Sequence, residues 1–587
     1  MELTQEQQDF LNEQGKQITL CASPGSGKTF VVAQKLIKYM GEWKFCHRGI
    51  AALSFTNIAS EEVKRQIANS EYQKTEIGYP HFCGTLDSFI NNFIFLRFGY
   101  LLMKDRKRPQ IIYDGVLQTM ASLFKRRHSL CYKNGCVQHP EWFHWTPNEE
   151  LLKNGKPIEC KIPVFPRPCL QAKQKLLEQG KVSQHDVTSF SKSLLEQYPK
   201  IAEILAYRFP VIIVDEVQDT SQEQAEIIDR IAKQNGIIQI SLVGDPDQSL
   251  YEWRNATPEY FIEKMNSGDW KSMYLSANFR SSQLICNAVR LFSKTLENRP
   301  AACAKGECAK YQIKPMLFLL SSDKTEDCVI ETFLATCKQY DIKISHKNVA
   351  VLTRATIHKV LVSDVWQTTE TELLAKATYF YHCLRRQEAY MLCEKALYSI
   401  EFGDVTGLTH EEIILRVEKR IPILEWRSKV ISVLRALPSP DLSVESWTSK
   451  ITSNIADLMN NGASITPRDD RKVGDIIKTK QRSRKNPDFL QQPLKSYFEK
   501  KVEAEYTRSS VHGVKGETFD AILLIVNAQK GNTLTPTILN TRALDDELIR
   551  IAYVAMTRPR KLLAVSMPKS KCKLSRFPKD LWNYIEV

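Results

Sequence analysis

The sequence predicts an α/β protein with two parallel sheets. Short runs that are apolar on both faces recur near both ends of the chain, and amphipathic helical patterns alternate with them. Such runs are typical of parallel strands buried between helices. Polar or acidic residues follow several of the runs directly, at the position where open α/β sheets bind ligands. The expected strands are residues 18–21, 50–55, 211–214, 238–243, 349–353 and 521–526.

Two long segments interrupt this alternation. Residues 96–195 and 356–500 have mainly helical patterns, and we expect each to be a helical domain inserted into an α/β core. The first core then comprises residues 1–95 and 196–274, and the second residues 275–355 and 501–587. A chain of 587 residues is too long for a single hydrophobic core, which favours such a division.

The composition is that of a globular protein with an unusual charge. The net charge of +14 indicates a polyanionic partner or a basic face, although a helical repeat protein can also be basic. No secretory signal begins the chain, and no uncharged apolar stretch is long enough to span a membrane. The 15 cysteines follow no regular framework and are expected to be reduced, so we expect a cytoplasmic protein without a membrane partner.

The run Ala22-Ser23-Pro24-Gly25-Ser26-Gly27-Lys28-Thr29 fits a phosphate-binding loop, with Ala22 where the first glycine usually stands. Gly25 and Gly27 allow backbone N–H groups to close on phosphate oxygens at the start of a helix. Lys28 would neutralise the β and γ phosphates of ATP, and the Thr29 hydroxyl would bind Mg²⁺. A chance glycine-rich turn is the alternative, but strand, loop and helix follow in the required order.

A second strand ends in acidic residues. Val211–Val214 is followed by Asp215 and Glu216, which would hold Mg²⁺ through water and polarise the attacking water, respectively. A surface acidic turn is the alternative, which an entirely apolar preceding strand disfavours. The next strand runs into Gln248, placed to sense the γ-phosphate, and into Tyr251 and Trp253, which would stack on unpaired bases unless they belong to the core.

These motifs together resemble those of the superfamily 1A helicases, the UvrD, Rep and PcrA group. The resemblance rests on residues 215–219 and 244–254 and on further motifs in the expected order. It implies two RecA-like P-loop cores, with ATP and Mg²⁺ bound between them. It also implies 3′-to-5′ movement along single-stranded DNA or tailed duplex DNA.

The resemblance also assigns roles to single residues. Gln7 resembles the adenine-reading glutamine, Phe279 the aromatic residue that stacks on adenine, and Arg280 and Arg558 the arginines that reach the γ-phosphate. Glu517 stands one place before the usual nucleotide-binding glutamate, a position that Thr518 occupies here. The residues implied to contact DNA are Thr56, Asn57, Thr85, Tyr251, Trp253 and His512.

Two weaker signals lie in the predicted insertions. Cys131, Cys136 and His139, with His144, Cys160 and Cys169 nearby, are candidates for a zinc site, but their spacing departs from common zinc motifs. The basic runs at residues 104–108, 125–127 and 471–485 are either solvated faces or contacts to DNA phosphates.

Three functions remain open from the sequence. The first is an ATP-dependent DNA helicase or translocase, in DNA repair or in antiviral defence. The second is an ATP-gated DNA-binding subunit that regulates a nuclease partner without unwinding, because the family includes such subunits, among them that of the Gabija anti-phage system. The third is an inactive fold, which the presence of Lys28, Asp215, Glu216 and Arg558 disfavours.

Overall fold

The computed structural model describes residues 3–68, 77–112, 144–145, 151–153, 156–157, 174–250, 256–294, 299–354, 365–403, 405, 408, 410–418, 420–461, 465–480, 489–499, 505–526, 534–569 and 574–587. The chain forms two compact units. One combines Met1–Ala355 with Tyr506–Val587, and the other is Thr356–Glu505. The first unit contains two six-stranded sheets, in both of which all neighbouring strands are parallel, so the predicted fold class is confirmed.

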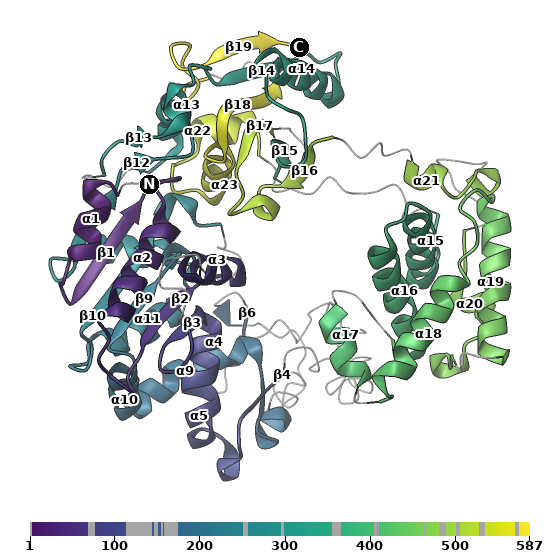
Figure 1. Ribbon diagram of the computed structural model, residues 1–587, viewed down its shortest axis with the longest axis horizontal. Coiled ribbons are helices and arrows are strands. Elements are labelled where there is room, and N and C mark those ends of the chain that lie inside the picture. Colours follow the sequence, from purple (N-terminus) through teal and green to yellow (C-terminus); the bar gives the residue numbers. More distant parts are fainter. Residues whose placement is uncertain are drawn as a thin grey trace. The chain divides into compact units, whose positions relative to one another are not determined.

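The first sheet has the strand order β11-β1-β10-β9-β2-β3 (Figure 1). Its strands are β1 (Gln17–Ala22), β2 (Ile50–Ser54), β3 (Phe82–Thr85), β9 (Val211–Val214), β10 (Gln239–Gly244) and β11 (Lys271–Leu275). Because all of them run in one direction, the residues that follow β1, β9 and β10 gather at the same edge of the sheet.

Helices cover both faces of the first sheet. They are α1 (Gln5–Asn12), α2 (Lys28–Gly41), α3 (Asn57–Ala68), α4 (Leu86–Phe89), α9 (Gln184–Gln197), α10 (Lys200–Arg208), α11 (Gln222–Ala232) and α12 (Pro258–Asn266). Alternate residues of β9 point to opposite layers, as the pleat requires. Ile212 and Val214 pack with residues of α9 to α12, whereas Val211 and Ile213 pack with residues of α1 to α3.

The second sheet has the strand order β16-β15-β17-β18-β14-β19. Its strands are β14 (Met316–Leu320), β15 (Val349–Thr353), β16 (Thr507–Ser510), β17 (Phe519–Ile525), β18 (Pro559–Pro568) and β19 (Asn583–Glu586). Leu563 and Val565 pack with residues of α13 (Gln283–Val289), α22 (Pro536–Thr541) and α23 (Glu547–Met556). Leu562 and Ala564 pack on the other face with residues of α14 (Glu326–Gln339).

The described part of the second unit is helical. Its helices are α15 (Thr369–His382), α16 (Arg386–Glu401), α17 (His410–Val417), α18 (Ile423–Arg435), α19 (Val444–Asn461), α20 (Val473–Ile476) and α21 (Ser496–Glu499). A separate core forms around the fully buried Trp426 and Trp447. Arg471, from one of the predicted basic runs, donates to Glu370 at 3.1 Å and to the Ser399 carbonyl at 3.2 Å, so this arginine is used inside the unit.

Strands also occur where the sequence pattern predicted helix. Within residues 96–195, α5 (Leu96–Phe98) is followed by β4 (Gln110–Ile112), which pairs in parallel with β8 (Lys181–Ser183). The short strands β5 (His144–Trp145), β6 (Leu151–Lys153) and β7 (Lys156–Pro157) form an antiparallel sheet. These strands have two or three residues each, too few for an alternating pattern to be recognised.

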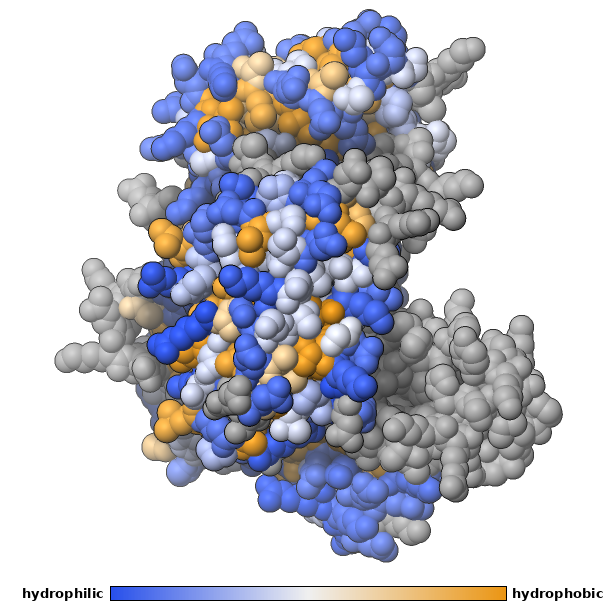
Figure 2. All heavy atoms as spheres, turned by 90° about the vertical axis from the view of Figure 1, so that its right-hand side faces the viewer, coloured by the Kyte–Doolittle hydropathy of each residue, from blue (hydrophilic) through white to orange (hydrophobic). Residues whose placement is uncertain are grey.

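The surface in Figure 2 mixes hydrophilic and hydrophobic residues. Across the described ranges, every helix is too short or too polar to cross a membrane. The cysteines of those ranges are all free thiols.

A buried lysine joins α1 to α2. Lys35 is 1% exposed, and its amine donates to the carbonyls of Phe10 at 2.7 Å and Glu13 at 3.1 Å. The amine also lies 4.4 Å from the centre of the Phe10 ring. Burial lowers the pKa of Lys35 to about 8, because an apolar environment disfavours the charged amine, although Glu13 opposes the change. The lysine therefore fixes the helix that carries Gln7, at a cost in free energy.

This cost should depend on pH. With a folded-state pKa of about 8 against an ordinary value of 10.5, protonated Lys35 destabilises the fold fully below pH 8. The penalty, about 3 kcal/mol, disappears as the pH rises above 10.5. We expect Lys35→Met to reduce the rise in thermal stability between pH 8 and 10.5, measured by differential scanning fluorimetry. Lys44→Met, at an exposed position shortly after the same helix, is the control, and an unchanged pH dependence in Lys35→Met would contradict the assignment.

Candidate functional site

The glycine-rich loop connects β1 to α2 in a conformation that requires both glycines. Gly25 and Gly27 have φ values of 74° and 76°, in the left-handed region that side chains disfavour. A Cβ atom on Gly25 would lie 2.7 Å from the Arg280 Cβ and 2.8 Å from the Asn278 Oδ1. The loop is therefore closed against the segment after β11, and it leaves its backbone N–H groups at the start of α2, where anions bind.

Neighbouring residues hold the loop from two sides. The Phe279 N–H donates to the Gly25 carbonyl at 2.8 Å, which brings the predicted adenine-stacking residue beside the loop. The Gln7 amide donates to the Ser26 carbonyl at 3.0 Å and accepts from the Thr4 N–H at 3.0 Å. Both ends of the Gln7 amide are thus used for the loop and for the cap of α1, and its role in reading adenine stays a prediction.

Lys28 lies between the two predicted acidic residues. Its amine is 3.0 Å from Asp215 Oδ1 and 2.7 Å from Glu216 Oε1. Burial lowers the pKa of the Lys28 amine, but the two carboxylates outweigh burial and raise it above its ordinary value. Burial raises the pKa of Glu216, but Lys28 and then Lys515 outweigh it and lower the pKa to about 2. The strand β9 and the loop after β1 therefore meet as the sequence analysis expected.

Asp215 keeps one oxygen available. Its N–H donates to the Leu53 carbonyl at 2.7 Å, which fixes it at the end of β9 beside β2. Asp215 Oδ2 is buried and has no hydrogen-bond partner among the described residues, and the same holds for the Ser26 hydroxyl of the loop. An unpaired carboxylate oxygen beside the phosphate loop fits a divalent cation that takes few protein ligands and several waters, as Mg²⁺ does. Thr29 lies in the first turn of α2, on the same loop.

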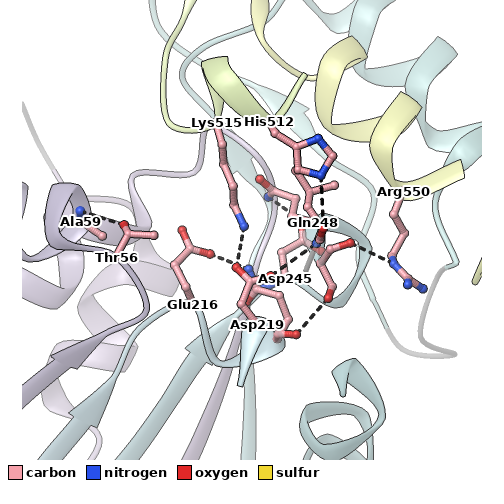
Figure 3. Close-up of polar contacts among 12 residues, drawn as sticks. Thr56, Ala59, Glu216, Asp219, Asp245, Gln248, His512, Lys515 and Arg550 are labelled. Carbon is pink, nitrogen blue, oxygen red and sulfur yellow. Dashed lines mark hydrogen bonds and ion pairs between the residues drawn. The ribbon is translucent and has the colours of Figure 1, made fainter. Parts of the chain in front are cut away.

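Residues of the second sheet reach the acidic segment after β9 (Figure 3). Lys515, beside the short helical turn His512–Val514, lies 2.5 Å from Asp219 Oδ2. Gln218 donates to Glu216 Oε2 at 2.5 Å and accepts from the Asp245 N–H at 3.1 Å, which orients the Glu216 carboxylate. Burial raises the pKa of Asp219, and Lys515 opposes this shift. The Gln218 amide thus orients Glu216 from within the same segment, while Lys515 of the second core pairs with Asp219.

Gln248 connects the two cores. Its Nε2 donates to Asp245 Oδ2 at 2.8 Å, and its Oε1 accepts from Arg558 Nη2 at 2.8 Å. The next residues are also held from the second core, because Arg550 donates to the Ser249 carbonyl at 3.1 Å and His512 lies 3.3 Å from the Leu250 carbonyl. The predicted phosphate sensor and the predicted arginine therefore touch each other directly.

Neither Arg280 nor Arg558 forms a direct ion pair with a carboxylate in the described part of the chain, although Glu216 and then Asp245 oppose the lowering of the Arg558 pKa by burial. Arg280 donates to the Thr557 carbonyl at 3.1 Å, and Arg558 donates to Gln248 and to the Val554 carbonyl at 3.2 Å. Burial, together with the positive charges of Arg558 and Arg560, lowers the pKa of Arg280 to about 9. Two guanidinium groups held near each other without a directly paired carboxylate form an attractive place for an anion.

The residues predicted to contact DNA show no arrangement as specific as that of the nucleotide site. Thr56 precedes α3 and accepts from the Ala59 N–H at 3.2 Å, and Thr85 accepts from the Ser88 N–H at 3.1 Å at the start of α4. Both hydroxyls thus cap helices, a structural role. Asn57 and Glu517 are exposed. Tyr251 and Trp253 lie outside the described residues, so their stacking on bases stays a prediction.

The zinc candidates also fall outside the described residues. These are Cys131, Cys136, His139, Cys160 and Cys169, and of His144 only the strand is described. Within the described ranges, no group of three or more His, Cys, Asp or Glu side chains could hold a metal ion.

Several residues of the site were not predicted. Asn278 Oδ1 accepts from the N–H groups of Arg280 and Ser281, both at 2.8 Å, and so shapes the segment beside Gly25. Lys515 and Gln218 lie inside motifs that the sequence analysis recognised, but no role was assigned to them. Arg299 belongs to no recognised motif, and only its position in space, against Asp245 and Asp247, reveals it.

Comparison with known proteins agrees with this geometry. Residues 3–135 and 164–268 match the UvrD/REP helicase N-terminal domain. The chain is 25% identical over 301 residues to a probable DNA helicase II homolog of Mycoplasma capricolum, covering 49% of this chain and 41% of the relative. It is 30% identical over 254 residues to an ATP-dependent helicase/nuclease protein of Natranaerobius thermophilus, covering 41% of this chain and 18% of the relative.

A third relative is the Gabija protein GajB of Bacillus cereus, 28% identical over 285 residues that cover 48% of this chain and 47% of the relative. The chain thus spans less than half the length of these three relatives. The matched domain includes the glycine-rich loop, Asp215, Glu216 and Gln248. The similarity to the UvrD/REP helicase N-terminal domain thus covers residues 3–135 and 164–268 of this chain, and the parallel sheet of the first core agrees with it.

Proposed function

We propose that this protein hydrolyses ATP between its two α/β cores and uses the reaction to move along single-stranded DNA. The observation that carries the proposal is the arrangement of positive charge. Arg280 lies beside the glycine-rich loop, Arg558 reaches Gln248 from the second core, and neither forms a direct ion pair with a carboxylate among the described residues. A polyphosphate bound at the loop would supply the missing negative charge.

The side chains then divide the chemistry. Gly25, Gly27 and Lys28 would bind the β and γ phosphates, while Thr29 and Asp215 would hold Mg²⁺, which neutralises phosphate charge when bound. Arg280 and Arg558 would stabilise charge that develops on the γ-phosphate. Gln7, Phe279 and the exposed Glu517 would contact the nucleoside. These roles are assigned by analogy with the motifs of the superfamily 1A helicases.

Glu216 would act as the general base. In the nucleotide-free protein its pKa is about 2, since Lys28 and Lys515 outweigh the effect of burial. When Lys28 turns to the phosphates, the nearer of these two cations leaves and the pKa of Glu216 rises, which makes the carboxylate a stronger base. The Gln218 amide would keep Glu216 oriented throughout. Nucleotide binding would thus activate the base.

Coupling to DNA would use the contacts between the cores. Arg558, Lys515, His512 and Arg550 all reach the segments after β9 and β10 from the second core. Hydrolysis would change the charge at this junction and so alter how the cores close. We propose that Thr56, Asn57, Thr85, Tyr251, Trp253 and His512 contact the strand. The net charge of +14 favours such a polyanionic partner.

A DNA-stimulated ATPase assay tests the hydrolytic part. Glu216→Gln should lower kcat by about 10²–10⁴-fold with nucleotide affinity retained, because it removes the base but not the phosphate contacts. Lys28→Ala should lower both. Glu203→Gln, on the exposed side of α10, is the matched control and should behave as wild type. Equal turnover in Glu216→Gln and wild type would overturn the proposal.

Strand displacement tests movement and its direction. We expect displacement from a duplex with a 3′ single-stranded tail and none from a duplex with a 5′ tail, as the family resemblance implies. Displacement only from the 5′-tailed duplex would contradict the polarity. ATP hydrolysis without displacement from either duplex would favour translocation or sensing over unwinding.

A second candidate function is that of an ATP-gated regulator of a nuclease in antiviral defence. The similarity to Gabija protein GajB and to a helicase/nuclease protein supports it. Housekeeping DNA repair is the alternative pathway. To separate the two pathways, the full chain is purified with the product of a neighbouring nuclease gene, and DNA cleavage is assayed with and without ATP. A stable complex whose DNA cleavage responds to ATP favours the regulatory role.

The loop itself gives a separate prediction. Gly25→Ala should lower nucleotide affinity by about tenfold or more, because the left-handed backbone costs about 1–2 kcal/mol and the new methyl group collides with Asn278. Gly268→Ala is the matched control, since a Cβ there meets no atom within 4 Å. Titration with a fluorescent ATP analogue measures both variants. Equal affinity of Gly25→Ala and Gly268→Ala would mean that the loop does not bind the phosphates.

A further inference from the structure

Arg299 is a buried arginine outside the glycine-rich loop and the acidic motifs. Its side chain is 5% exposed. Nη1 lies 3.0 Å from Asp245 Oδ1 and 2.8 Å from Asp247 Oδ2, and Nη2 lies 3.3 Å from Asp245 Oδ2. The guanidinium therefore holds Asp245 through two nitrogen atoms and Asp247 through one. A planar, permanently charged group suits this geometry, and a lysine could not reproduce it.

The contacts continue from Asp245 to the predicted phosphate sensor. Asp245 Oδ2 accepts hydrogen bonds both from Arg299 Nη2 and from Gln248 Nε2, the latter at 2.8 Å. Gln248 Oε1 in turn accepts from Arg558 Nη2 at 2.8 Å. A glutamine amide has one accepting and one donating end. Because Asp245 takes the donating end, the accepting end must face Arg558.

Arg299 also joins the two cores. It follows α13, whose Ile285 and Val289 pack in the core of the second sheet, whereas Asp245 and Asp247 follow β10 of the first sheet. Asp247 receives two more bonds from the second core, from the Ser293 hydroxyl at 2.5 Å and the Lys294 N–H at 2.9 Å. The segment that carries Gln248 is thus fixed to the core that carries Arg558.

We infer that Arg299 is a positioning residue for hydrolysis, which acts through Asp245 on the Gln248 amide and through Gln248 on Arg558. The inference rests on the proposed ATPase function. Without Arg299, the Asp245 carboxylate keeps the bond from the Asp247 N–H to its Oδ1 at 3.2 Å but loses the guanidinium that holds both of its oxygens, so it orients the Gln248 amide less firmly. Rotation would turn the amide nitrogen, a donor, toward the donating Arg558 and break their contact. Arg299 itself touches neither the phosphate loop glycines nor Lys28 in the contacts described.

A double-mutant cycle in the full-length protein tests the inference. Arg299→Lys keeps the charge but loses the two-nitrogen grip on Asp245, and we expect kcat of the DNA-stimulated ATPase to fall by about 10–100-fold, as for other partners that orient catalytic groups. KM for ATP should change by less than about threefold, because Arg299 acts on the hydrolytic step. Arg290→Lys, an exposed arginine of the same segment, is the matched control and should retain wild-type kcat.

The same substitution in a Gln248→Ala background separates positioning from general stability. If Arg299 acts through Gln248, Arg299→Lys should lower kcat there by less than about threefold, because the residue it orients is already absent. A merely structural role would give the same fold-loss in both backgrounds, and that result would overturn the inference. A wild-type kcat in Arg299→Lys would also overturn the inference.

A second variant covers the case in which Arg299→Lys does not fold, as judged by its melting profile. Arg299→Met combined with Asp247→Asn removes the arginine and one carboxylate together, which reduces the unpaired buried charge. It should show the same loss of kcat and the same dependence on Gln248. If wild-type protein itself shows no DNA-stimulated ATPase, the proposed function fails. If wild type is active and the cycle is additive, only the role of Arg299 fails.

Discussion

The hydrogen bond between Gln248 and Arg558 is the contact on which the rest of the site depends, because it joins the two sheets at the predicted γ-phosphate position. Each partner makes a second hydrogen bond within its own core: Gln248 donates to Asp245, and Arg558 donates to the Val554 carbonyl. In the proposed mechanism, a change of charge at this contact would act on both packed cores at once, because packed cores do not deform continuously.

Burying a charged group costs free energy, and the charged groups of the site differ in how they are paired. Lys28 pairs with both Asp215 and Glu216, and Arg299 pairs with both Asp245 and Asp247, so in each group one cation serves two carboxylates. Arg280 and Arg558 lack such a partner among the described residues. Two arginines without a directly paired carboxylate suit the polyphosphate of the proposed nucleotide, in addition to the shape of the glycine-rich loop.

Sequence patterns were reliable where a single strand or loop carries its own signal. Val211–Val214 and Val349–Thr353 were predicted to the residue, because four or five apolar residues end at a polar one. Ile238 was placed in a strand that begins at Gln239, since an exposed isoleucine looks like a buried one in sequence. The strands β3, β11, β14, β16, β18 and β19 were missed, although β14 and β18 are strongly apolar.

By itself the sequence determined the α/β class and the presence of the glycine-rich loop, and it predicted Lys28, Asp215, Glu216, Gln248 and Arg558 as site residues, because motif spacing is local information. Tertiary structure alone decided which of them meet. Lys515 reaches Asp219 across 296 positions and Arg299 reaches Asp245 across 54. Such pairs depend on two sheets packing together, and the hydrophobic pattern that drives this packing is non-directional, so it carries no record of which charged groups it will bring into contact.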